Sequence, residues 1–212
     1  MADSTVESQG QVKTGPSGRT GNNIWLPQRA GPFGELITSL AIAAFYEAIR
    51  GGEVYLACNQ SAITYGTALT ATGVTYHLCN PIGSDLDLVV LHAGFTFASV
   101  TTGGQVVYAA SGPHATAVTA GTGLTVRNAN GNANSGKGLA KSATTLPEAP
   151  VAVRAGPSVY LSVAATNHVA GQLSEYVNGS LWVPPGAQLS IQGITIVATG
   201  LVSMTWAEVK RS

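Results

Sequence analysis

The sequence predicts a mainly β protein: an antiparallel β-sandwich of the jelly-roll kind, with one N-terminal helix and an extended N-terminal arm. From residue 53 onward, short runs rich in Val, Ile, Thr, Tyr and Leu alternate with clusters of Gly, Pro, Asn and Ser, as in strands joined by turns. No regular alternation of strand and helix patterns occurs, which argues against Rossmann and TIM-barrel architectures. Many short strands with polar turns favour a sandwich, jelly roll or barrel.

Residues 1–32 are predicted to form the extended arm. Glycine and proline interrupt this range so often that we expect no continuous element. The arm contains one apolar patch, Ile24, Trp25 and Leu26. Because an aromatic anchor in an arm normally docks on a partner, we predict that these three residues contact another subunit or a partner protein.

Residues 33–50 are the single range with a helical pattern. Apolar residues follow approximate helical spacing at Phe33, Leu36, Ile37, Leu40, Ala44 and Ile49. Gly51 and Gly52 follow at once and are suited to end a helix.

The remainder of the predicted domain, which spans 33–212, reads as strands. We expect them near 53–58, 74–79, 86–100, 104–110, 122–127, 158–166, 180–183, 187–198 and 200–209. Asn178-Gly179 is typical of a tight turn. Residues 128–150 lack any periodicity and are predicted to be a long loop, of the kind that is disordered or functional.

The composition argues against several functional classes. Ten Lys and Arg balance ten Asp and Glu, so charged residues make up only 9% of the chain, against about 25% in typical domains. A neutral chain with 45% hydrophobic residues is not expected to be disordered or to bind nucleic acid by charge. No apolar stretch reaches the ~18 residues of a membrane span, and the N-terminus lacks the apolar core of a secretory signal. Surfaces covered by identical neighbours tolerate so few charges, so we expect an oligomer.

One segment has the spacing of a phosphate-binding loop. Gly131, Gly136 and Lys137 match GxxxxGK, but Gly138 stands where the motif needs Ser or Thr. Pro147 soon breaks any helix that could follow. We interpret the match as chance in a Gly- and Asn-rich loop.

The cysteines and histidines give no strong metal motif. Cys58, His77 and Cys79 could supply three zinc ligands, but a structural zinc site normally needs four, with closely spaced pairs. Ordinary strand residues are the favoured interpretation. Cys58 and Cys79 could also pair as a disulfide across neighbouring strands, although buried free thiols are favoured.

No nucleophile and base can be paired along the chain, so a hydrolase is the weakest functional class. Asp85 and Asp87 precede His92, but no activated nucleophile accompanies them, and we expect the two aspartates to cap the turn after Asn80. We therefore expect no enzyme activity, no cofactor and no metal.

The C-terminal third carries the most specific pattern. Leu181-Trp-Val-Pro-Pro-Gly-Ala-Gln-Leu189 is followed by a final run that ends in Thr205-Trp-Ala-Glu-Val209. This ending resembles virion structural proteins of tailed bacteriophages. The segments Phe45-Tyr46-Glu47…Val54-Tyr55 and Cys79-Asn-Pro-Ile-Gly-Ser84 resemble the same group in the same order, so the likeness extends loosely over about 33–209.

The resemblance implies a capsid decoration (cement) protein or a head or tail fibre component, usually trimeric and β-rich, with no catalytic residues to carry over. We therefore expect a non-enzymatic subunit of the virion, assembled in the host cytoplasm. Its expected partners are copies of itself and the major capsid protein or other virion proteins, without nucleic acid or membrane.

A second functional class is a receptor- or carbohydrate-binding module on a fibre. Such a module needs exposed aromatic side chains flanked by hydrogen-bonding groups. The sequence offers Tyr108, Tyr160 and Trp182 as the leading residues for this role.

Overall fold

The computed structural model describes residues 11–13, 25–27, 45–115, 121–143, 145–159 and 172–211. The chain divides into two units, Met1–Ala44 and Phe45–Ser212. In the first unit, β1 (Gln11–Lys13) pairs antiparallel with β2 (Trp25–Pro27). Two short strands therefore lie within the range that we predicted to hold no continuous element.

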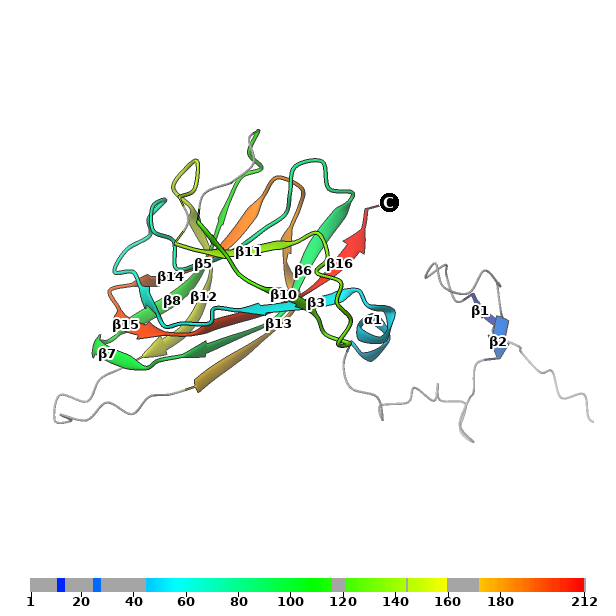
Figure 1. The fold of residues 1–212 in the computed structure, drawn as a ribbon, viewed down its shortest axis with the longest axis horizontal. Helices are drawn as coiled ribbons and strands as arrows, with labels where there is room; N and C mark the ends of the chain where they lie inside the picture. Colours follow the sequence, from blue (N-terminus) through cyan, green and yellow to red (C-terminus); the bar gives the residue numbers. More distant parts are fainter. Residues whose placement is uncertain are drawn as a thin grey trace, which may run out of the picture. The chain divides into compact units, whose positions relative to one another are not determined.

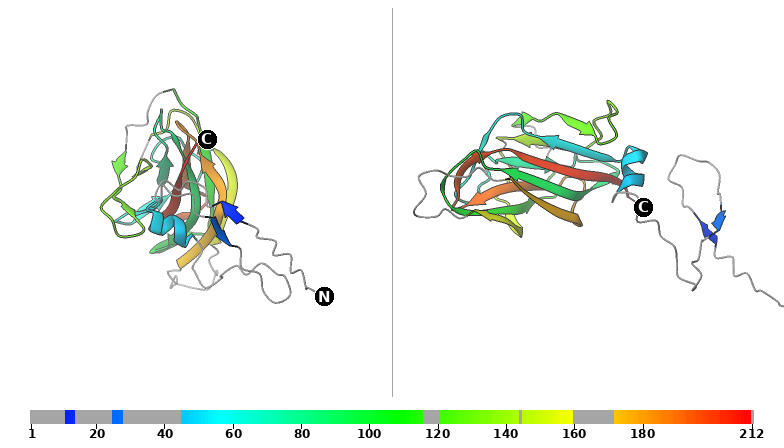
Figure 2. Two further views of the ribbon diagram at one scale, coloured as in Figure 1. Left: turned by 90° about the vertical axis from the view of Figure 1, so that its right-hand side faces the viewer. Right: turned by 90° about the horizontal axis from the view of Figure 1, so that it is seen from below.

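The second unit is mainly β and its sheets are antiparallel, as predicted (Figure 1). A five-stranded sheet has the order β10-β3-β16-β6-β13. Its strands are β10 (Val126–Asn128), β3 (Val54–Cys58), β16 (Val202–Lys210), β6 (Leu86–Thr96) and β13 (Gln172–Val183). Figure 2 shows β16, in red, running between β3 and β6.

A six-stranded sheet has the order β12-β8-β14-β5-β11-β9. Its strands are β12 (Val151–Val159), β8 (Gly104–Ser111), β14 (Gln188–Ile194), β5 (Tyr76–Cys79), β11 (Leu139–Ser142) and β9 (Thr122–Gly123). A smaller three-stranded sheet has the order β4-β15-β7. Its strands are β4 (Ile63–Tyr65), β15 (Val197–Gly200) and β7 (Ser99–Thr102).

The main core is formed by side chains from both large sheets. Strand β16 shows the period of two that places them there: Val202, Met204 and Trp206 are fully buried, and Ser203 and Thr205 between them are partly exposed. These inward residues join one apolar cluster with residues of the six-stranded sheet, including Tyr76, Leu78, Tyr108 and Ile191. The alternation of residue types along β16 accounts for this inward face.

The helix α1 (Tyr46–Gly51) is much shorter than the predicted range 33–50. Phe45 has a positive φ of 66°, a left-handed conformation that interrupts a right-handed helix. The prediction of one continuous helix is therefore wrong at Phe45, and residues 33–44 lie outside the described residues. Gly52, with φ 72°, ends α1 as the sequence predicted.

Helix α1 covers part of the outer face of the five-stranded sheet. Its Ala48 and Ile49 pack against a small apolar cluster made of Val54, Val89, Leu91 and Ala207. In the part of the chain that the structure describes, no helix is long and apolar enough to cross a membrane.

Several strand and loop boundaries in the structure differ from the predicted ones. The predicted strand 86–100 is interrupted after Thr96 and continues as β7, and β13 extends well upstream of the predicted 180–183. The predicted loop 128–150 contains β11, which pairs with β5 and β9, so the loop interpretation is wrong at 139–142. Strand β12 begins at Val151 rather than at 158, and residues 160–166 of that prediction lie outside the described residues.

Two segments that carry the sequence resemblance are in direct contact. The buried side chain of Asn80 donates from Nδ2 to the carbonyl oxygens of Leu86 and Val183, both at 2.8 Å. The backbone of Asn80 also accepts from Gly186 N–H at 2.9 Å and donates to Ala187 at 3.1 Å. Asn80 therefore holds the corner at Pro184–Gly186, where Gly186 has the positive φ of 79° that a tight turn requires.

Candidate functional site

Two of the three predicted contact residues of the arm belong to the described part of the chain. Ile24 lies outside the described residues. Trp25 and Leu26 lie on β2, opposite Lys13 and Val12. The proposed docking of these residues stays a prediction.

The three aromatic residues predicted for carbohydrate binding have different positions. Tyr108 is fully buried against Phe95, with ring centroids 6.2 Å apart, so its prediction as a surface residue is wrong. Tyr108 lies on the inward face of β8, opposite the fully buried Ile191 of β14. Tyr160 lies outside the described residues. Trp182 is 60% exposed, as the prediction requires.

Exposed apolar side chains are concentrated on β12 and β13. These strands stand at the ends of the strand orders of the six-stranded and five-stranded sheets. The exposed residues on them are Val151, Val153, Leu173, Tyr176 and Trp182. Val151 and Tyr176 are the most exposed, at 69% and 68%. Leu173 and Tyr176 project to opposite faces of β13, since Leu173 is opposite the buried Phe95 and Tyr176 is opposite His92.

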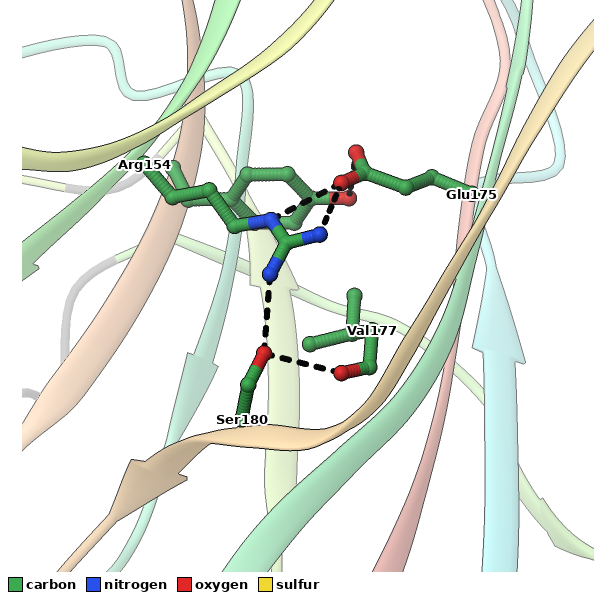
Figure 3. Close-up of polar contacts among 5 residues, drawn as sticks. Arg154, Glu175, Val177 and Ser180 are labelled. Carbon is green, nitrogen blue, oxygen red and sulfur yellow. Dashed lines mark hydrogen bonds and ion pairs between the residues drawn. The ribbon is translucent and has the colours of Figure 1, made fainter.

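A polar network connects β12 to β13 (Figure 3). The Arg154 guanidinium donates from Nε to Oε1 of Glu175 at 2.8 Å, and its Nη2 lies 2.6 Å from the same oxygen. Arg154 also donates from Nη1 to Ser180 Oγ at 2.8 Å. The hydroxyl of Tyr108 donates to Oε2 of Glu175 at 3.0 Å. The network fixes the edges of the two sheets relative to each other through side chains.

The burial of Tyr108 has an electrostatic consequence. Desolvation, together with the neighbouring Glu175 carboxylate, raises the pKa of Tyr108 well above its ordinary value. The hydroxyl therefore stays protonated and remains a hydrogen-bond donor to Glu175.

A large bulge interrupts β13 beside this network. Tyr176 is opposite His92 and Leu181 is opposite Val90, so the four residues 177–180 of β13 correspond to the single residue Leu91 of β6. Asn178 and Gly179 both have positive φ, at 51° and 75°. The predicted tight turn is therefore confirmed in conformation, although it lies inside a strand rather than ahead of one.

Hydrogen bonds hold the bulge in shape. Ser180 Oγ donates to the carbonyl of Val177 at 2.8 Å, and Trp182 Nε1 donates to the carbonyl of Gly179 at 2.6 Å. Since the indole N–H is bonded within the chain, the orientation of the exposed Trp182 ring is fixed.

Tyr176 and Trp182 present their rings on the outer face of the five-stranded sheet. Tyr176 contacts the ring of His92, with centroids 5.0 Å apart and an interplanar angle of 61°. Trp182 is opposite Val89, which belongs to the cluster that α1 covers. Directly paired residues project to the same face of a sheet. The two aromatic side chains form the candidate site, which we call the β13 bulge surface. The network of Arg154 and Glu175 lies on the other face of β13, since Glu175 is opposite the buried Ala93.

The glycine-rich loop that resembles a phosphate site holds a carboxylate of the protein itself. Oε1 of Glu208 accepts hydrogen bonds from the backbone N–H groups of Lys137 at 2.7 Å and Gly138 at 2.8 Å. These are the donors that a phosphate group would need. The interpretation of the motif as a chance match is therefore supported by a structural role for the loop.

The cysteines and His77 behave as strand residues. Cys58 lies on β3 and Cys79 on β5, in different sheets, and both are free thiols as predicted, although Cys79 is buried and Cys58 only partly so. Within the described ranges, no group of three or more His, Cys, Asp or Glu side chains could hold a metal ion. Burial, with a smaller contribution from the positive charge of Lys141, lowers the pKa of His77 to about 4. His77 is therefore neutral at pH 7.

The turn after Asn80 is stabilised differently from the prediction. Ser84 Oγ, rather than an aspartate, accepts from the backbone N–H of Leu86 at 3.2 Å. Asp87 instead lies 3.5 Å from the Arg211 guanidinium.

Comparisons with known proteins give no relative: no family model, no curated protein and no solved structure matches this chain. Function is therefore argued from the residues.

The sequence did not single out Arg154, Glu175, Tyr176 or Ser180. Arg154 and Glu175 lie far apart in the chain and meet only because the edges of the two sheets meet. The one available signal was Asn178-Gly179, which marks the turn between Tyr176 and Trp182.

Proposed function

We propose that this protein is a non-enzymatic structural subunit of a virion, a capsid decoration protein that associates with copies of itself, as a trimer, and with neighbouring shell proteins. In this proposal the sandwich is jelly-roll-like, and the extended arm at 1–32 carries shell contacts through Ile24, Trp25 and Leu26. The resemblance of the C-terminal pattern to virion proteins of tailed bacteriophages supports the proposal.

The observation that carries the proposal is the apolar edge where β12 meets β13. Val151, Val153 and Leu173 are exposed there, in a chain with only 9% charged residues. A protein with so little charge has little repulsion to keep copies apart. We infer that a second copy covers this edge, which we call the β12–β13 edge.

The contact is expected to involve side chains rather than the addition of a strand. Strand β12 contains Pro157 and two shifts of register, and β13 contains the bulge at 177–180. Prolines and bulges of this kind keep edge strands from pairing with another chain. A stable contact buries about 1,600 Å² in total, and symmetry would repeat it around the oligomer.

Sedimentation of the isolated chain tests the proposal. At about 10 µM we expect a defined oligomer, and we expect the double variant V151E/V153E to be a folded monomer because each new carboxylate would be buried without a partner. V197E is the matched control, since Val197 is exposed on β15, a strand of the smaller sheet.

The arm is tested separately. A chain lacking residues 1–32 is expected to keep its oligomeric state but to lose binding to shells assembled from the major capsid protein. A monomeric wild-type protein would contradict the proposed self-association, and unchanged shell binding of the shortened chain would contradict the role of the arm.

A further inference from the structure

We propose that the β13 bulge surface anchors the contact between two copies of this chain, so that the second copy extends from the β12–β13 edge onto the outer face of the five-stranded sheet. This inference rests on the proposed function, which assigns the edge to a second copy. It deepens that function because it names Tyr176 and Trp182 as the side chains that bind the copy, and they lie on a different face of β13 from Leu173.

Strand β13 exposes apolar side chains on both of its faces. Leu173 is 37% exposed on the inner side, and Tyr176 and Trp182 are 68% and 60% exposed on the outer side. Because β13 is the last strand in the order of its sheet, both of these faces can be reached around one edge. A ligand that lies flat on one face of the sheet leaves the other face uncovered, whereas a folded protein chain can contact both.

The exposed area decides how far the contact extends. A stable protein contact buries about 800 Å² on each partner, of which somewhat under 60% is apolar, or roughly 450 Å². The exposed parts of Tyr176 and Trp182 present roughly 300 Å², and those of Val151, Val153 and Leu173 add roughly 150 to 200 Å². The three aliphatic side chains of the edge are therefore too few for a stable contact by themselves. With the two aromatic side chains included, the apolar area reaches the amount required.

The two aromatic rings are held in place before any partner binds. Trp182 donates from Nε1 to the carbonyl of Gly179 at 2.6 Å, and the ring of Tyr176 contacts that of His92 with centroids 5.0 Å apart. A side chain that is already ordered loses little entropy when it is covered. Tyrosine and tryptophan in such positions supply most of the binding energy of many protein interfaces.

The charges near the edge are compatible with a second copy. Arg154 and Glu175, on the inner side of the edge, bind each other with an Nε–Oε1 distance of 2.8 Å, so a covering copy would bury no unpaired charge there. The chain as a whole has ten Lys and Arg and ten Asp and Glu, so two copies carry no net charge that would keep them apart.

Sedimentation equilibrium of the full chain gives the first test. Trp182→Ala is expected to raise the Kd between copies by at least tenfold, as for the central aromatic side chain of an interface, and Trp182→Phe should raise it less. Leu56→Ala is the matched control and should leave the Kd unchanged. Leu56 is 41% exposed on β3, which two strands of the same sheet separate from β13.

Fluorine NMR of the protein labelled with 5-fluorotryptophan gives a second test, which does not depend on the folding of Trp182→Ala. The chain has three tryptophans, and substitution of each by phenylalanine assigns its resonance. The change in chemical shift between H₂O and D₂O reports how exposed each indole is. For Trp182 we expect a large change in the monomeric V151E/V153E variant and a small one in the wild-type oligomer. Trp206 is fully buried and should give a small change in both.

The outcomes separate this inference from the proposed function. A wild-type oligomer in which Trp182 keeps its full solvent effect, or whose Kd Trp182→Ala leaves unchanged, would overturn the inference and leave self-association in place. A monomeric wild-type protein would overturn both. Loss of binding to assembled shells in Trp182→Ala, with unchanged self-association, would also overturn the inference, because the β13 bulge surface would then contact a different protein.

Discussion

Gly138 lies against the indole ring of Trp206 so closely that no larger residue fits between them. A Cβ atom at Gly138 would be 2.8 Å from Trp206 Nε1 and 3.1 Å from Leu88 Cδ1. Trp206 is fully buried at the centre of β16 and stacks with Tyr55. The glycine-rich loop therefore closes over the core at this point, and its glycine content has a packing reason.

Gly138→Ala is expected to destabilise the protein by about 1–3 kcal/mol, because the added methyl group overpacks the contact with Trp206. Gly123→Ala is the matched control, since nothing lies within 4 Å of a Cβ atom there. Urea unfolding followed by circular dichroism measures both. Equal midpoints for the two variants would contradict the close packing of the loop.

Glu208→Ala is expected to lower the free energy of unfolding by about 1–3 kcal/mol, because the N–H groups of Lys137 and Gly138 lose a charged acceptor. Glu208→Gln should lose less stability, since its amide oxygen can still accept these hydrogen bonds. Hydrogen exchange of these two N–H groups reports the effect directly. Unchanged protection in Glu208→Ala would show that the carboxylate does not hold the loop.

Asn80→Ala is expected to lower the free energy of unfolding by about 2 kcal/mol or more, because the buried carbonyl of Val183 and the partly buried carbonyl of Leu86 lose their donor. Thermal unfolding measures the change. Asn132→Ala, at an exposed position in the glycine-rich loop, should shift the midpoint far less. Similar shifts in the two variants would argue against a special role for Asn80 at the Pro184–Gly186 corner.

His77 is expected to lower the free energy of unfolding as the pH falls from about 6.5 towards 4. Its pKa is about 4 in the folded chain, against 6.5 for the free side chain. Between these values the unfolded state binds a proton that the folded state does not, so the contribution of His77 is complete above pH 6.5 and is lost as the pH falls towards 4. Urea unfolding from pH 7.5 to 4 measures the slope.

A His77→Leu variant provides the comparison for that measurement. Its stability should fall less steeply than that of the wild-type protein over the same range, because leucine binds no proton. Parallel slopes would mean that His77 is protonated equally in the folded and unfolded states, and would contradict the effect of its burial.

Strand existence could be predicted from the sequence wherever one face of a strand is buried. Along β16, Val202, Met204 and Trp206 alternate with Ser203 and Thr205, so the period of two identified both the strand and its inward face. The turns at Asn178-Gly179 and Pro184–Gly186 could also be predicted from the sequence, because glycine and asparagine are the residues that most readily adopt positive φ values.

The candidate site could be predicted only in part. Trp182 is exposed, as its predicted role requires, but Tyr108 was predicted for the same role on the same grounds and is buried. Both residues are aromatic and both lie in apolar runs, so composition could not separate them. What separates them is that Tyr108 lies on a central strand facing the core and Trp182 lies on the outer face of an edge strand.

The sequence alone determined the mainly β, antiparallel character of the fold, the positions of most strands and turns, and the scarcity of charge, because these depend on residues close together in the chain. The tertiary structure decided which strands are neighbours, which faces are exposed, and that Arg154 meets Glu175 and Glu208 meets Lys137. Such pairs form between distant segments, and their energy depends on strand order and register, which no local pattern of residues specifies.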